Sequence, residues 1–134
     1  MVENTVVKEQ LTDAMIDAGA ALTQKLDEIG IPATAALWLF APDINEWRLL
    51  FASPEVTTSG PRAVYGKIQQ AIAELQDKAA ATPLSVVRVL DAGDDLVRLL
   101  RIAVRTGTGL SRMRFTKNAI NGHYIEDALI YRVT

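Results

Sequence analysis

The sequence predicts a single α+β domain over residues 1–134, with three helices packed on a five-stranded sheet that is mostly antiparallel or mixed. Three observations support this prediction. Apolar residues recur at spacings of three and four in three separate segments, as in amphipathic helices. Short runs rich in β-branched and aromatic residues lie between these segments, as in strands. The chain is also 49 % apolar and long enough for one core. The predicted order is α-β-β-α-β-α-β-β.

The first helix is predicted over residues 5–29. Thr5 is its candidate N-cap, Gly30 its C-terminal stop, and Pro32 prevents continuation. Its apolar positions are Leu11, Met15, Ala18, Leu22, Leu26 and Ile29. The runs ATAALWLFA (33–41) and WRLLFAS (47–53) are predicted strands, and PDINE between them supplies the turn of a hairpin.

A second helix is predicted to begin at Ser59, as the cap, and Pro61, in the first turn. Gly66 lowers the local helix propensity, which suggests that another segment packs closely there. The predicted buried stripe consists of Val64, Ile68, Ala71, Ile72 and Leu75. A third strand follows over LSVVRVL (84–90).

The third helix is predicted to begin after Asp94 as cap and to end at Gly107. Two stripes support it, because both follow helical spacing on opposite sides. The apolar stripe is Leu96, Leu99, Leu100, Ala103 and Val104, and the basic stripe is Arg98, Arg101 and Arg105.

The segment 111–134 is predicted to form a hairpin around Asn121-Gly122, because both residues tolerate a positive φ. A two-residue loop pairs Ile120 with His123, Lys117 with Glu126, and Phe115 with Ala128. That register directs four residues to a core face and leaves Arg112, Arg114 and Asp127 on the other. The predicted core-facing residues are Met113, Phe115, Ala128 and Ile130.

The charge is unevenly distributed, although the net charge is only −2. Residues 1–60 hold nine acids and three bases, whereas residues 96–125 hold six bases and no acid between Leu96 and Ile125. Such a local field attracts phosphate or an acidic partner. The candidate binding residues are therefore Arg98, Arg101, Arg105, Arg112 and Arg114. The alternative is that these arginines pair with the chain's own acidic N-terminal half.

Sequence motifs for catalysis are sparse. There is no cysteine, no HExxH and no phosphate-binding glycine loop, so we expect neither a metal site nor a cofactor. The acids of DAGDD are interpreted as helix-capping residues. The single histidine, His123, sits beside the predicted turn, and Glu126, three residues along, is expected to point to the opposite face. An enzyme using His123, Tyr124 and nearby acids is the least favoured of three hypotheses.

The favoured hypothesis is a non-enzymatic protein-interaction module, bacterial in style, cytoplasmic and able to self-associate as a homodimer. The sequence shows no secretory signal and no apolar run long enough to cross a bilayer. A C-terminal strand ending IYRVT is expected to present an edge to a partner. A protein partner or second copy is favoured over nucleic acid, because the chain is acidic, with a pI of about 5.4, and carries few aromatic residues. Nucleic-acid binding through the arginines remains the alternative. A small-molecule ligand is not identified.

Overall fold

The computed structural model describes residues 7–134 and confirms a single α+β domain with a five-stranded mixed sheet. The strand order is β3-β2-β1-β5-β4, in which β2 and β3 are parallel and the other neighbouring pairs are antiparallel. Two short 3-10 helices accompany the α-helices. The elements are α1 (Asp13–Glu28), β1 (Ala35–Ala41), β2 (Glu46–Ser53), α2 (Glu55–Ser59), α3 (Pro61–Leu75), η1 (Gln76–Ala79), η2 (Leu84–Val86), β3 (Val87–Asp91), α4 (Asp95–Ala103), β4 (Met113–Ile120) and β5 (His123–Val133).

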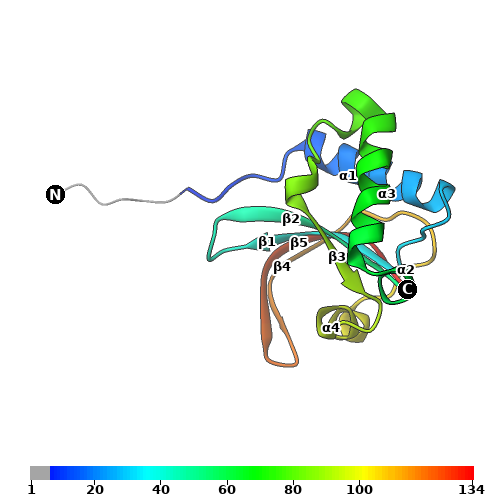
Figure 1. Ribbon diagram of the computed structural model, residues 1–134. Coiled ribbons are helices and arrows are strands. Elements are labelled where there is room, and N and C mark those ends of the chain that lie inside the picture. Colours follow the sequence, from blue (N-terminus) through cyan, green and yellow to red (C-terminus); the bar gives the residue numbers. More distant parts are fainter. Residues whose placement is uncertain (1–6) are drawn as a thin grey trace.

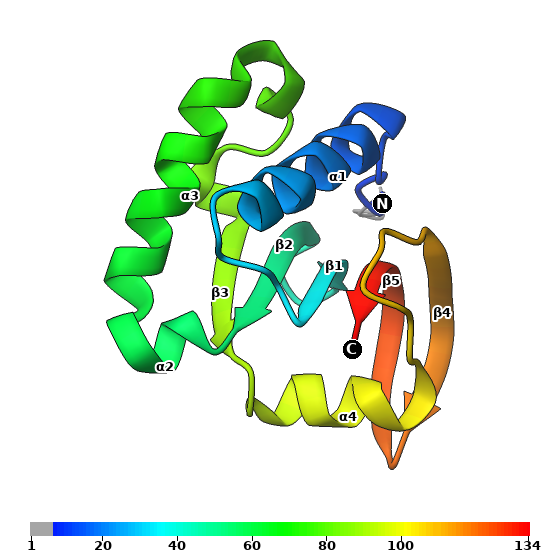
Figure 2. The ribbon, with the colours of Figure 1, turned by 90° about the vertical axis from the view of Figure 1, so that its right-hand side faces the viewer.

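Helices cover both faces of the sheet, so the protein has two cores. Helices α1 and α3 lie on one face and α4 crosses the other (Figures 1 and 2). The first core joins Leu22 of α1 and Ile68 of α3 to Trp38 of the sheet. The second joins Val97 and Leu100 of α4 to the opposite sheet face. None of the helices within residues 7–134 combines the length and apolar character that a membrane span requires.

Helix α1 begins at Asp13, so the predicted start near residue 5 is wrong; Thr5 itself lies outside the described residues. Thr12 is the cap, and its hydroxyl accepts a hydrogen bond from the backbone N–H of Met15 at 3.2 Å. Gly30, with φ +82°, follows the helix end, as predicted.

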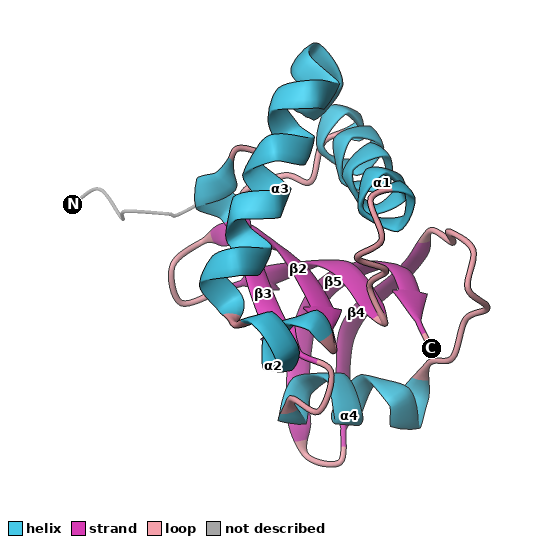
Figure 3. Ribbon diagram, turned by 45° about the vertical axis from the view of Figure 1, so that its right-hand side comes forward, coloured by secondary structure: helices cyan, strands magenta, loops and turns pink. Residues whose placement is uncertain are grey.

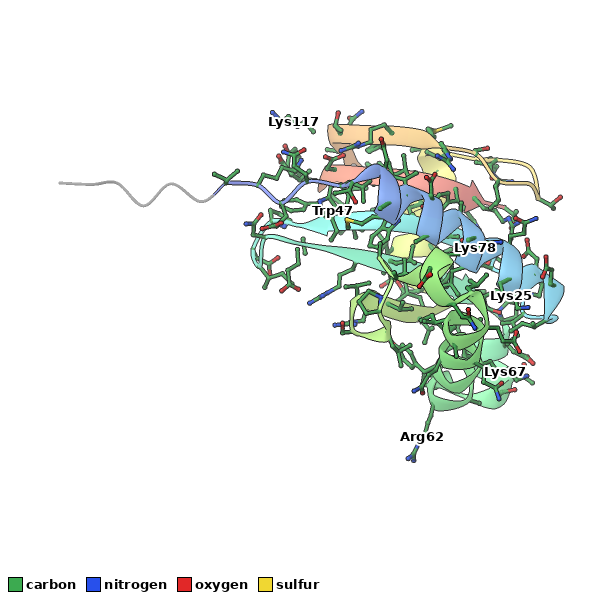
Figure 4. The ribbon with its side chains drawn as sticks, turned by 90° about the horizontal axis from the view of Figure 1, so that it is seen from above. Lys25, Trp47, Arg62, Lys67, Lys78 and Lys117 are labelled. Carbon is green, nitrogen blue, oxygen red and sulfur yellow. The ribbon has the colours of Figure 1, made fainter. Side chains whose placement is uncertain are left out.

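The segment before α1 is held by side chains of the turn and strand that follow β1. The side chain of Asn45 binds Val7 and Glu9 by hydrogen bonds of 3.0 and 2.9 Å to their backbones. The indole of Trp47 donates to the Glu9 carbonyl at 2.9 Å, so Trp47 lies against this segment, as Figure 4 also shows. These side chains from the β1–β2 hairpin, which is confirmed, satisfy backbone groups that a helix would otherwise pair.

The region around α2 and α3 corrects two predictions. Ser59 is the last residue of α2 and does not cap α3, which is preceded by Gly60 with φ +85°. Pro61 is in the first turn of α3 as predicted, and Val64, Ile68 and Ala71 are buried. A Cβ on Gly66 would meet nothing within 4 Å, so no segment packs closely there.

Helix α4 is capped by Asp94, as predicted, through a 2.9 Å hydrogen bond from the Leu96 N–H. It ends at Ala103 and not at Gly107, because the next residue is extended and Thr106 donates to the Val133 carbonyl at 2.8 Å. Val97 and Leu100 are its buried residues, whereas Ala103, expected in the stripe, is exposed.

The Asn121-Gly122 turn is confirmed, and so is the register that pairs Ile120 with His123 and Phe115 with Ala128. Lys117 breaks the ladder, because its φ of +45° takes it out of the extended region. The predicted Lys117–Glu126 pair is therefore absent from residues 7–134, and Glu126 accepts instead from Tyr124.

The interruption at Lys117 also changes which residues reach the core. Phe115 and Ile120 pack in the same core cluster although regular alternation would separate them. Of the predicted core-facing residues, Phe115, Ala128 and Ile130 are confirmed, whereas Met113 is 41 % exposed. Strand β5 lies between β1 and β4, so the expectation that the C-terminal strand forms an edge is wrong.

Candidate functional site

The five arginines predicted as a binding set lie on two different faces of the protein. Arg98 and Arg101 belong to α4 and Arg105 follows it, on the sheet face covered by that helix. Arg114 pairs in register with Leu129, which packs into the core beneath α1 and α3. Arg112 binds Asp17 of α1 at 3.1 Å. The structure therefore separates Arg112 and Arg114 from the three arginines around α4.

Arg112 and Arg114 both have carboxylate partners within the chain. The Arg112–Asp17 pair is the intramolecular pairing with the acidic N-terminal half that the sequence offered as an alternative. Arg114 holds Asp127 through two hydrogen bonds of 2.6 Å, and Lys8 binds the same carboxylate at 2.7 Å. Arg114 is therefore engaged through two of its N–H groups, whereas Arg112 makes one exposed contact.

Asp127 is the centre of a structural cluster. It is 2 % exposed, and burial alone would raise its pKa, but the hydrogen bonds and charges of Arg114 and Lys8 outweigh burial and lower the pKa. The two cations also lie over aromatic rings: Lys8 is 4.9 Å from the Phe40 centroid and Arg114 is 5.5 Å from that of Trp47. This cluster joins the N-terminal segment to β5, β4 and the β1–β2 hairpin.

A second ion pair, in which the arginine is buried and the acid is partly exposed, links β5 to α1. Arg132 is 4 % exposed and donates hydrogen bonds of 2.9 and 2.7 Å to the Asp27 carboxylate. It also donates to the Ala33 carbonyl at 3.1 Å. No buried side-chain nitrogen or oxygen among residues 7–134 lacks a hydrogen-bond partner. The buried charges of the described chain are thus engaged in holding its elements together.

The arginines around α4 are less engaged. Arg98 and Asp95 lie 3.8 Å apart, with both side chains largely exposed. Arg101 donates to the Thr134 carbonyl at 2.8 Å and to the Ala92 carbonyl at 3.3 Å, and neither acceptor is a carboxylate side chain. Arg105 is exposed and forms no ion pair with any described residue. Between them Ile102 is 63 % exposed. We call Arg98, Arg101, Ile102 and Arg105 the α4 surface.

Beside α4 lies a cavity of about 310 Å³, which we call the α4 groove. Its apolar walls are Leu39, Phe40, Pro42, Leu96, Leu99 and Ile125. Its polar lining residues are Asp95, His123, Tyr124 and Glu126. A larger depression of about 770 Å³ near the β1–β2 turn is lined mainly by polar residues such as Glu9, Glu46 and Arg48, whereas the α4 groove has the apolar walls typical of ligand pockets.

His123, Tyr124 and Glu126 all line the groove, and Tyr124 and Glu126, two residues apart in β5, are in direct contact. The Tyr124 hydroxyl donates to Glu126 at 2.8 Å, and this hydrogen bond raises the pKa of Tyr124. His123 is exposed and no hydrogen bond joins it to a described side chain. Residues 7–134 contain no group of three or more side chains that could hold a metal ion.

The α4 groove is the site that the sequence did not predict. Its lining comes from three segments that are far apart in the sequence: the end of β1 with Pro42, the first turn of α4, and the start of β5. The sequence pointed to the arginines of the α4 surface, because helical spacing places Arg98 and Arg101 on one side; Arg105 lies beyond the end of the helix. No family model, curated protein or solved structure shows significant similarity to the chain.

Proposed function

We propose that this chain is a non-enzymatic protein-interaction module that binds an acidic segment of a partner protein through the α4 surface. The observation that carries the proposal is an exposed apolar side chain set among exposed arginines. Ile102 is 63 % exposed, and the side chains of Arg98 and its exposed neighbour Asp95 are 71 % and 102 % exposed. Arginine and apolar anchors are typical of interface centres.

The guanidinium groups of the α4 surface can bind a partner carboxylate without breaking strong interactions within the chain. The Arg98–Asp95 contact is long and solvent-exposed, and such pairs contribute about 0–1 kcal/mol. Arg105 forms no ion pair with a described residue, and Arg101 has used only two of its five N–H donors on backbone carbonyls. A planar guanidinium also matches a carboxylate with two parallel hydrogen bonds. An acidic strip carrying one apolar side chain complements this surface.

The same observations favour a protein over nucleic acid as partner. Nucleic-acid binding by arginine relies on neutralising many phosphates along a backbone. Arg112 and Arg114, which would have extended the basic region, are paired with Asp17 and Asp127 on the other side of the sheet. The remaining basic surface is short, and an exposed isoleucine at its centre adds nothing to phosphate binding. Nucleic acid is therefore an outcome of the test below.

The test compares a variant of the α4 surface with a charge-reversed control on α3. The first, Arg98→Glu/Ile102→Asp/Arg105→Glu, changes the α4 surface and leaves Arg101 in place, because Arg101 fixes the helix to backbone carbonyls. The control, Arg62→Glu/Lys67→Glu, changes two exposed bases of α3 that extend away from the body of the protein (Figure 4). Circular dichroism confirms that both variants fold.

Each protein is immobilised and exposed to a lysate of its native cells, with and without nuclease. We expect an acidic protein that is retained by wild type and control and lost from the α4 variant. That protein, once purified, should bind the wild type at least tenfold more tightly than the α4 variant, and binding should weaken with salt. Equal retention by all three proteins would overturn the proposal. Retention that nuclease abolishes would assign the surface to nucleic acid.

Self-association is a separate form of the same proposal. A second copy offers exposed acids such as Asp13 on α1, which the arginines of α4 could contact. Light scattering of wild type and α4 variant decides between the forms, since a dimer that the variant abolishes identifies the second copy as partner. A cytoplasmic location is likewise part of the proposal, and cell fractionation tests it.

A further inference from the structure

We propose that the α4 groove is a binding site for a small organic cation, that is, an ammonium group on a compact apolar body. The groove lies between α4 and the ends of β1 and β5 (Figure 3 shows α4 below the sheet). Leu96 and Leu99 line the groove, while Arg101 is hydrogen-bonded to the backbone of Thr134 and Ala92. The groove adjoins the α4 surface at Asp95, which lines the groove and lies 3.8 Å from Arg98.

The walls of the groove suit an apolar body. Ile125 is 5 % exposed, and Leu39, Leu96 and Leu99 are half-buried members of the core beneath α4. A volume of about 310 Å³ is at the lower end of the range for small-molecule pockets. It fits a single small molecule better than a folded partner.

The charged groups that line the groove are all acidic. Asp95 and Glu126 are present, and the lining contains no lysine or arginine. The Tyr124 hydroxyl donates to one oxygen of Glu126, which fixes the carboxylate and leaves its other lone pairs available. Tyr124 is 61 % exposed, so its aromatic face is accessible to a cation. Because Arg98 lies 3.8 Å from Asp95, the charge preference rests mainly on Glu126, and it favours an ammonium group over a carboxylate or phosphate.

The experiment uses three probes that share one apolar body and differ only in the head group: 4-phenylbutylamine, 4-phenylbutanol and 4-phenylbutyrate. Each is titrated into the ¹⁵N-labelled protein and followed by two-dimensional NMR. We expect the amine to shift the backbone resonances of Leu96, Leu99, His123 and Ile125. The alcohol should bind more weakly at the same place, and the carboxylate should leave these resonances unchanged.

Variants then test the charge. Glu126→Gln keeps an oxygen that can accept from Tyr124 but removes the charge, so it should weaken amine binding about fivefold and leave the alcohol unaffected. Tyr124→Ala removes a largely exposed ring and should weaken the amine as well. The matched control is Glu74→Gln on α3, which should change nothing. Equal binding of amine and carboxylate, shifts outside the groove, or no shift at millimolar amine would overturn the proposal.

Discussion

Replacing Gly19 by alanine tests the packing of α1 on the sheet. Gly19 is buried in the middle of α1, over the fully buried rings of Trp38 and Tyr131. An added Cβ would lie 2.7 Å from the Trp38 Nε1 atom and in direct overlap with the Tyr131 hydroxyl oxygen. One methyl group therefore cannot be added unless the helix or both rings move.

The size of the effect follows from three contributions. Overpacking a well-filled core costs about 1–3 kcal/mol. The displaced rings make three hydrogen bonds. The Trp38 indole donates to the Tyr131 hydroxyl at 3.0 Å and to the Met15 carbonyl at 3.2 Å, and that hydroxyl donates to the Ile16 carbonyl at 2.5 Å. Weakening them adds about 1 kcal/mol. Alanine returns about 1 kcal/mol through its higher helix propensity. The net prediction is a loss of about 2 kcal/mol in the free energy of unfolding.

The assay is urea denaturation followed by circular dichroism, with Gly66→Ala as the matched control. Gly66 also lies inside a helix, but a Cβ there would meet nothing within 4 Å. The control should therefore gain about 0.5–1 kcal/mol from helix propensity and reduced unfolded-state entropy. The two identical substitutions are predicted to act with opposite sign. A Gly19→Ala variant as stable as wild type would refute the α1 packing described above.

Four further substitutions have expected outcomes measurable by the same denaturation assay. Tyr131→Phe should lower the free energy of unfolding by about 1 kcal/mol, because it removes the buried hydroxyl and its hydrogen bonds while the ring stays. Asp127→Asn should cost about 2 kcal/mol, a value reduced by the partial exposure of Arg114. The pKa of Asp127 is lowered in the folded state, so the ionised carboxylate stabilises the fold above about pH 4 and this stabilisation is lost at lower pH. The free energy of unfolding of Asp127→Asn should therefore fall less on acidification than that of the wild type. Gly122→Ala should cost about 1 kcal/mol at φ +81°, and Lys117→Gly should be neutral or stabilising by about 0.5 kcal/mol, since glycine accepts φ +45° freely.

The elements that the sequence predicted well are those with strong local signals. The Asn121-Gly122 turn determines both its own geometry and the register of the hairpin around it. Asp94 as the cap of α4 is equally local, since it accepts a hydrogen bond from a residue two positions away. The α+β order followed from periodicity alone, which distinguishes helix from strand without knowledge of tertiary contacts.

The incorrect boundaries arose where distant residues compete for the backbone. The segment before Thr12 has a helical pattern, but Asn45 and Trp47 bind its backbone from a hairpin more than thirty residues away. Val104 leaves the helical conformation at the point where the chain begins to follow β5. Local propensity carries no information about such contacts.

The candidate site was only partly predictable for the same reason. Helical spacing identified the three arginines around α4, yet the partner of Arg112, Asp17, is 95 residues away in sequence. Pattern analysis cannot tell an arginine with a distant carboxylate partner from one without. The α4 groove was missed because its walls come from segments that only the fold brings together.

The most direct test of the proposed function is hydrogen–deuterium exchange of the chain with and without its purified partner. Binding through the α4 surface predicts slowed amide exchange confined to residues 95–105, which contain Arg98, Ile102 and Arg105. The peptides of α3, residues 61–75, should exchange at the same rate in both samples. Protection of α3, or complex formation without protection of residues 95–105, would contradict the assignment of α4 as the surface that binds the partner.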